Sequence, residues 1–169
     1  MGIRNGTENT VGIYGFSVAA KKHYEEFETL NIRLREIKEF LYEGIKNIEG
    51  TVINTNMERS APHILNVSFS GIRSEIVLHT LESSKIYVSS GSACSSNDLK
   101  KKKILEVMGE DKRIYDSAIR LSFGYFNTMD EAEYALNEIK REITLLRKRL
   151  KINAWRSYDK IRGNNIKRS

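Results

Sequence analysis

Apolar residues recur at spacings of three and four along two long stretches of the chain, with charged residues between them, which is the pattern of amphipathic helices. The first stretch ends before Gly50, a residue typical of the position just after a helix. The second follows Asn127 and Thr128, which are good helix caps, and carries Asp130 and Glu131 in its first turn. These patterns predict one helix that reaches about residue 48 and another that reaches about residue 150.

Alternation of apolar and polar residues, which indicates a half-buried strand, marks two further stretches. Leu65, Val67 and Phe69 share one face of the first stretch. The second stretch, 117–123, alternates in the same way and places Arg120 on its polar face. Both stretches are therefore predicted to be strands with one face in the core.

Shorter runs complete the order of elements. Residues 51–54 and 86–88 read as short strands, and residues 74–81 and 99–108 as short helices. We expect the first two strands to pair antiparallel. The order predicts an α/β (α+β) two-layer sandwich that follows a long helix.

Residues 11–20 are small and apolar, which predicts a buried helix. This helix runs directly into the first amphipathic helix.

Charge and cysteine content narrow the class of protein. Residues 1–99 hold 10 Lys and Arg against 12 Asp and Glu, whereas residues 100–169 hold 18 against 10, and much of the excess lies in 147–169. A single cysteine excludes an intramolecular disulfide and a cysteine-cluster metal site, and the three histidines show no ligand spacing, so no metal site is predicted. No apolar run approaches the ~20 residues of a membrane span. The expected location is the cytoplasm.

The stretch Ser89–Asp98 contains that single cysteine, Cys94, among serine, glycine and alanine. An inert cysteine usually packs among large apolar residues, whereas these neighbours favour an accessible loop. A reactive thiol also needs a cation or base to raise its thiolate fraction. The run of lysines at 100–103 is close enough to provide positive potential, although it also reads as a solvated helix start. The composition favours a reactive Cys94.

Arg120 has two interpretations. A charge in the middle of a strand is usually exposed or ion-paired at a sheet edge. Alternatively it faces a cleft and binds an anion, which its two-pronged guanidinium does well.

Four motifs taken together resemble the C-terminal part of cysteine desulfurases, pyridoxal-phosphate enzymes of the class V aminotransferase family. They are Arg4–Asn9, Ala61–Phe69, Ser89–Ser96 and Ile119–Gly124, and they occur in family order. The resemblance covers residues 2 to about 150 and is strongest to the NifS/IscS-like branch with a long cysteine loop. It implies the small C-terminal domain of a fold-type I transferase.

The resemblance also implies roles for three residues. Cys94 would take sulfur from L-cysteine as a persulfide and leave L-alanine, for iron–sulfur cluster or thio-tRNA biosynthesis. Arg120 would hold the substrate carboxylate. Thr7 would bind the phosphate of pyridoxal phosphate in the neighbouring subunit, so the complete enzyme would be a homodimer that also meets a sulfur-acceptor or scaffold protein.

The family's large domain, with its cofactor lysine, has no counterpart in this sequence. We therefore expect a C-terminal fragment or truncated version, with 1–20 as a remnant of the large domain and the start of the linker helix, 21–150 as the small domain and 151–169 as a basic tail. Alone it would bind no pyridoxal phosphate and be inactive, and residues 11–20 would be exposed and favour self-association.

Two alternatives stay open. The first is a non-enzymatic interaction or sulfur-relay module. The second is a nucleic-acid-binding module that uses the basic tail, but the strands lack paired aromatic residues for base stacking. We expect no direct nucleic-acid or membrane partner.

Overall fold

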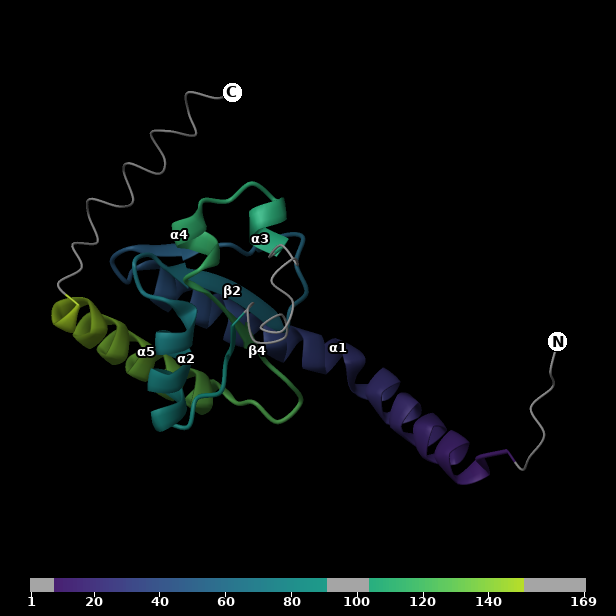
Figure 1. Cartoon of the computed structure of the whole chain (residues 1–169). Helices are drawn as coiled ribbons and strands as arrows, with labels where there is room; N and C mark the ends of the chain where they lie inside the picture. The colour runs from purple at the N-terminus through teal and green to yellow at the C-terminus, as the bar shows by residue number, and fades with distance from the viewer. Residues whose placement is uncertain (1–7, 91–103, 151–169) are drawn as a thin grey trace.

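The structure, a computed structural model, describes residues 8–90 and 104–150 (Figure 1). Within these ranges one mixed sheet-and-helix unit is formed. Its elements are α1 (Thr10–Lys46), β1 (Thr51–Ile53), β2 (Ile64–Phe69), α2 (Ser74–Ser83), β3 (Ser89–Ser90), α3 (Ile104–Val107), α4 (Lys112–Tyr115), β4 (Ala118–Ser122) and α5 (Met129–Arg149).

The strands form an antiparallel sheet in the order β1-β2-β4-β3. The expected antiparallel pairing of the first two strands is confirmed. In the central pair, Leu65 lies opposite Leu121 and Val67 opposite Ile119. Because side chains alternate along a strand, these four apolar residues share one face of the sheet.

Helices α1, α2 and α5 cover that apolar face, so the predicted two-layer arrangement is confirmed (Figure 1). Each helix contributes the side chains that its sequence periodicity places on one stripe. The core residues from the helices are Ile37, Leu41, Ile45, Val77, Leu81, Ala132, Leu136, Ile139 and Ile143.

Helix α1 has 37 residues and a length of about 55 Å. Asn9 caps its start by accepting a hydrogen bond from the Gly12 backbone N–H at 3.0 Å. Only its second half packs on the sheet, and the first half projects from the rest of the molecule (Figure 1). Val11 is 82% exposed and Phe16 76% exposed. The predicted helix is present, but its first half is not buried by the described residues.

Among the described residues two cations are buried, Lys38 and Arg147, which periodicity does not predict. The Lys38 ammonium donates to Ser60 Oγ at 2.6 Å and to the Ala61 carbonyl at 2.9 Å, and burial lowers its pKa. The Arg147 guanidinium donates to backbone carbonyls next to β1 and β2, and its pKa is also lowered by burial. Lys38 thereby connects α1, and Arg147 connects α5, to loops that flank the strands.

Two elements differ from the prediction. Residues 86–88 form no strand, and the strand is formed by Ser89–Ser90 instead, because these two residues pair with β4. The short helix α4 is an addition, begun by the Asp111 side chain, which accepts from the Arg113 N–H. Of the predicted helix at 99–108, residues 99–103 lie outside the described residues and Ile104–Val107 form α3, which is followed by Gly109 with a φ of +87°.

Within 8–90 and 104–150, none of the helices combines the length and apolar character that crossing a membrane requires.

Candidate active site on the open face of the sheet

Arg120 lies in the middle of β4, with its side chain on the sheet face opposite to α1, α2 and α5. Its neighbours Ile119 and Leu121 are buried, whereas Arg120 is exposed. Its register partners are Asn66 on β2 and Ser89 on β3. The guanidinium lies 3.5 Å from Ser89 Oγ, and no carboxylate among the described residues pairs with it. An exposed guanidinium in this state is able to bind an external anion.

A chain of hydrogen bonds orders the polar face beside Arg120. The Asn54 amide donates to Asn66 Oδ1 at 2.8 Å and to Ser68 Oγ at 2.7 Å. Ser68 Oγ in turn donates to the Ile114 carbonyl at 2.8 Å. Because Asn66 Oδ1 accepts this hydrogen bond from Asn54, the NH₂ group of the Asn66 amide points away from Asn54. The face next to Arg120 is therefore a fixed polar surface.

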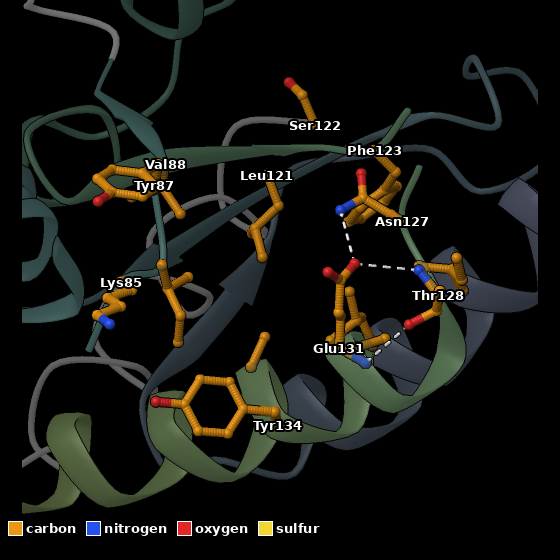
Figure 2. Close-up of a pocket in the computed structure, with 15 residues that line it drawn as sticks. Lys85, Tyr87, Val88, Leu121, Ser122, Phe123, Asn127, Thr128, Glu131 and Tyr134 are labelled. Atoms are coloured by element: carbon orange, nitrogen blue, oxygen red, sulfur yellow. Dashed lines mark hydrogen bonds between the residues drawn. The ribbon is translucent and has the colours of Figure 1, made fainter. Parts of the chain in front are cut away.

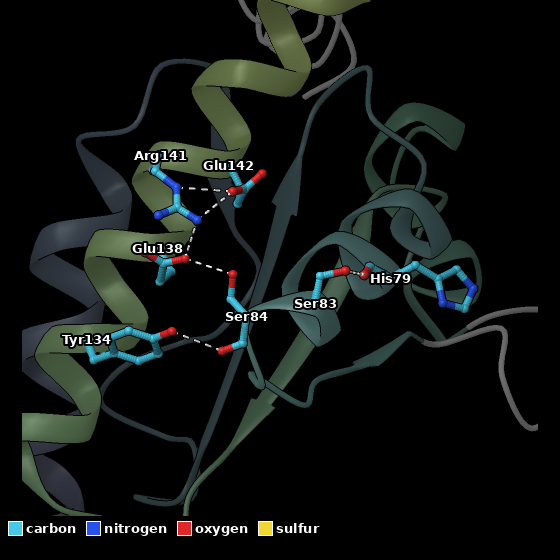
Figure 3. Close-up of polar contacts among 7 residues, drawn as sticks. All are labelled: His79, Ser83, Ser84, Tyr134, Glu138, Arg141 and Glu142. Carbon is cyan, nitrogen blue, oxygen red and sulfur yellow. Dashed lines mark hydrogen bonds and ion pairs between the residues drawn. The ribbon is translucent and has the colours of Figure 1, made fainter.

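The segment that leads into β3 is anchored to α5 (Figure 3). Ser84 Oγ donates to Glu138 Oε2 at 2.7 Å, and the Tyr134 hydroxyl donates to the Ser84 carbonyl at 3.2 Å. Lys85 follows with a φ of +59°, so the chain turns sharply at the end of α2. These contacts fix where β3 begins and hence where the cysteine-containing stretch starts.

Cys94 and Thr7 both lie outside the described residues, so their predicted roles rest on the sequence. Ser90 is the last described residue before Cys94 and pairs with Ile119, the neighbour of Arg120. The described residues that precede Cys94 in the sequence therefore end on the strand beside Arg120.

A cavity of about 460 Å³ lies on the helix side of the sheet (Figure 2). Lys85, Tyr87 and Val88 form one wall, and Asn127, Thr128 and Glu131 form the other. The Glu131 carboxylate accepts hydrogen bonds from the Thr128 N–H at 3.1 Å and the Asn127 amide at 3.2 Å. Arg120 does not line this cavity, so the cavity and the open-face site are separate.

The described residues contain no group of three His, Asp, Glu or Cys side chains that could hold a metal ion. Sequence reasoning found Arg120 but missed Asn66 and Ser89 as its neighbours. Alternation along β2 indicated that Asn66 lies on the polar face of the sheet. The β2–β4 register was needed to place Asn66 beside Arg120.

The described part of the site is thus a polar sheet face that carries the exposed Arg120, beside the strand that ends at Ser90. The family model described as "Aminotransferase class-V" matches residues 1–135. The chain therefore belongs to the class V aminotransferase family.

Relatives within this family are cysteine desulfurases. The chain is 38% identical over 146 residues to proteins named "Cysteine desulfurase IscS" from Salmonella schwarzengrund (strain CVM19633) and from Photorhabdus laumondii subsp. laumondii. Each match covers 86% of this chain and 36% of the relative. The chain thus spans about a third of the length of the curated relatives that it matches, consistent with a C-terminal fragment of a cysteine desulfurase.

Solved structures agree with this fold. A NifS-like protein superposes with a TM-score of 0.73 at 33% identity, over 85% of this chain and 36% of that one. A NifS-like protein from Rickettsia africae ESF-5 superposes with a TM-score of 0.69 at 25% identity, over 83% and 36%. The resemblance to cysteine desulfurases that the four motifs indicate is confirmed.

Proposed function

We propose that the chain acts as the sulfur-accepting and substrate-orienting part of a cysteine desulfurase. Cys94 accepts the sulfur atom of L-cysteine and becomes a persulfide, while L-alanine leaves. Arg120 binds the substrate carboxylate through its guanidinium. The sulfur then passes to an acceptor or scaffold protein, for iron–sulfur cluster or thio-tRNA biosynthesis.

The position of Arg120 is the observation that carries this proposal. Its guanidinium is exposed on the open face, without a carboxylate partner among the described residues, and its register partner Ser89 belongs to the strand that precedes Cys94. A carboxylate held at Arg120 would thus lie beside the tether of the thiol. The cysteine desulfurases among the relatives support the same chemistry.

The described residues do not by themselves fit pyridoxal phosphate, the cofactor that the family resemblance implies. The cavity of about 460 Å³ presents the Glu131 carboxylate, which would repel a phosphate group, and Arg120 does not line that cavity. Thr7 is proposed to donate a hydrogen bond to the phosphate group of the cofactor in the neighbouring subunit of a homodimer. The remaining cofactor contacts and the lysine that binds it would come from protein outside this sequence.

A chimera tests the proposed roles. The matching third of a relative such as the Photorhabdus laumondii protein is replaced by this chain, and alanine formed from L-cysteine is measured. We expect turnover that Cys94→Ser abolishes. We expect Arg120→Lys to raise KM for L-cysteine about 10–100-fold, since a lysine makes no two-pronged contact with a carboxylate.

Arg113→Gln is the matched control, because Arg113 already forms an ion pair, with its Nε atom 3.0 Å from Asp111 Oδ1. It should leave both kcat and KM unchanged. A chimera with the absorption band of bound cofactor, but with turnover that is insensitive to Cys94→Ser, would contradict the proposal.

The chain on its own should show no imine band when pyridoxal phosphate is added. An absorbance titration measures this directly. A stable band that a single lysine substitution removes would show that the chain binds the cofactor itself.

A sulfur-relay module is the second candidate, favoured by the poor fit of the cofactor to the described residues. Such a module would gain the mass of one sulfur atom at Cys94 from glutathione persulfide, with glutathione released, and would return that sulfur to a thiol acceptor. Mass spectrometry of the wild-type chain and the Cys94→Ser variant distinguishes this activity from unspecific oxidation.

A further inference from the structure

A row of four polar side chains crosses the open face of the sheet. They are Asn54 just after β1, Asn66 on β2, Arg120 on β4 and Ser89 on β3, each opposite the next across the antiparallel pairs. Residues opposite each other in such pairs have Cα atoms about 4.5–5.5 Å apart, and their side chains share one face. Arg120 is therefore bordered by Asn66 on one side and by Ser89 on the other.

The direction of the Asn66 amide follows from a chain of hydrogen bonds that ends at a backbone carbonyl. The Ile114 carbonyl can only accept, so the Ser68 hydroxyl donates its hydrogen to that oxygen. Ser68 Oγ must then accept from the Asn54 amide 2.7 Å away, which therefore presents its NH₂ group. The same NH₂ group lies 2.8 Å from the Asn66 amide. Asn66 must consequently turn its oxygen towards Asn54.

The NH₂ group of Asn66 therefore lies on the Arg120 side of the amide. Strands β1 and β4 flank β2 on opposite sides, and Asn54 belongs to the β1 side. No described residue accepts a hydrogen bond from this NH₂ group. The Arg120 guanidinium cannot accept one, because arginine has only donors. Two neighbouring donor groups thus share a position where the described residues provide no acceptor.

We propose that Asn66 is a second substrate-binding residue, whose NH₂ group donates a hydrogen bond to the carboxylate that Arg120 binds. This inference rests on the proposed function of Arg120. A carboxylate offers about four acceptor positions on its two oxygens, and a two-pronged guanidinium uses only two of them. The Asn66 hydrogen bond uses a third position, from the side of β2. The carboxylate is then fixed in direction as well as in place.

Asn66→Asp tests the direction of the amide in the full chain, without any activity assay. The variant keeps an oxygen that accepts from Asn54 and replaces the NH₂ group with a second oxygen. The new carboxylate should pair with Arg120, so its pKa in an NMR titration should lie below the ordinary value of about 3.9. Adding Arg120→Gln should raise that pKa by about one unit or more. A pKa that Arg120→Gln leaves unchanged would overturn the proposal.

The chimera with a cysteine desulfurase relative tests the role in substrate binding. Asn66→Leu removes the NH₂ group without adding a charge and should raise KM for L-cysteine about tenfold. Asn66→Asp should raise KM about 10–100-fold, because its carboxylate competes for Arg120 and repels the carboxylate of the substrate. In both variants kcat should change by less than about threefold, as expected when ground state and transition state lose the same contact.

Asn56→Asp is the matched control. Asn56 is exposed, and its side-chain oxygen accepts from the Glu58 and Arg59 N–H groups at 3.0 Å, which an aspartate oxygen also does. The control adds the same charge and should leave KM unchanged. If Arg120→Lys raises KM but neither Asn66 variant does, the inference is wrong and the proposed function stands. If Arg120→Lys also leaves KM unchanged, both are wrong.

Discussion

The contact between α1 and α5 depends on a glycine, and this dependence can be measured. A Cβ atom added at Gly44 would lie 2.6 Å from Leu136 Cδ1 and closer still to Cδ2, whereas real Cβ atoms essentially never come within 3.0 Å of another heavy atom. Leu136 is buried in the core, so its side chain has little space to move. Gly44→Ala gains about 1 kcal/mol of helix propensity but loses roughly 1–3 kcal/mol to overpacking.

The cost of Gly44→Ala should disappear when Leu136 is shortened. Leu136→Ala alone should destabilise the chain by about 2–5 kcal/mol, because it leaves a cavity. In that background the Gly44→Ala methyl enters the cavity, so the substitution should stabilise by about 1 kcal/mol from helix propensity. The two changes should therefore couple by about 1–3 kcal/mol.

Urea unfolding followed by helical circular dichroism, at a concentration where the chain is monomeric, measures the four free energies of unfolding. The control pairs Leu136→Ala with Val107→Ala, since Val107 is 70% exposed on α3, which packs on α4. That pair should be additive within about 0.5 kcal/mol. Additivity of the Gly44 and Leu136 substitutions would refute the close approach of the two helices.

Three further predictions concern stability. Ile139→Ala, at a fully buried position, should cost about 2–5 kcal/mol in urea unfolding, whereas Ile104→Ala, 80% exposed, should change stability by less than about 0.5 kcal/mol. Thr128→Ala should cost about 1 kcal/mol by the same assay, because it removes the hydroxyl that caps α5 at the Glu131 N–H; unchanged stability would contradict that cap. Hydrogen bonds from Arg113 lower the pKa of Asp111, so the stability that Asp111→Asn removes should be present above pH 3.8, the ordinary pKa, and be lost as the pH falls below it; a difference that persists in acid would contradict this.

Local pattern was sufficient for most of the elements. The periodicity of Leu34, Ile37 and Leu41 predicted the buried stripe of α1, and alternation predicted that Leu65 and Val67 face the core. These features follow from the two backbone periodicities of 3.6 and 2 residues, which are local. The motifs around Cys94 and Arg120 also indicated the family from the order of residues alone, and the similarity to cysteine desulfurases confirms that family.

Long-range pairing was decided by the tertiary structure. The sheet order places Asn66 and Ser89 beside Arg120, although they lie 54 and 31 residues away in the sequence. Residues 86–88 have the composition of a strand but no partner, because a strand exists only where another backbone accepts its hydrogen bonds.

Burial depends on neighbours as well as on composition. Arg147 and Lys38 are charged yet buried, because backbone carbonyls from distant loops accept their hydrogen bonds. Val11 and Phe16 are apolar yet exposed, because nothing within the described residues reaches them. The sequence by itself determined which residues seek burial and which form each element. Only the tertiary structure decided which of them find a partner, since that requires segments far apart in the chain to meet.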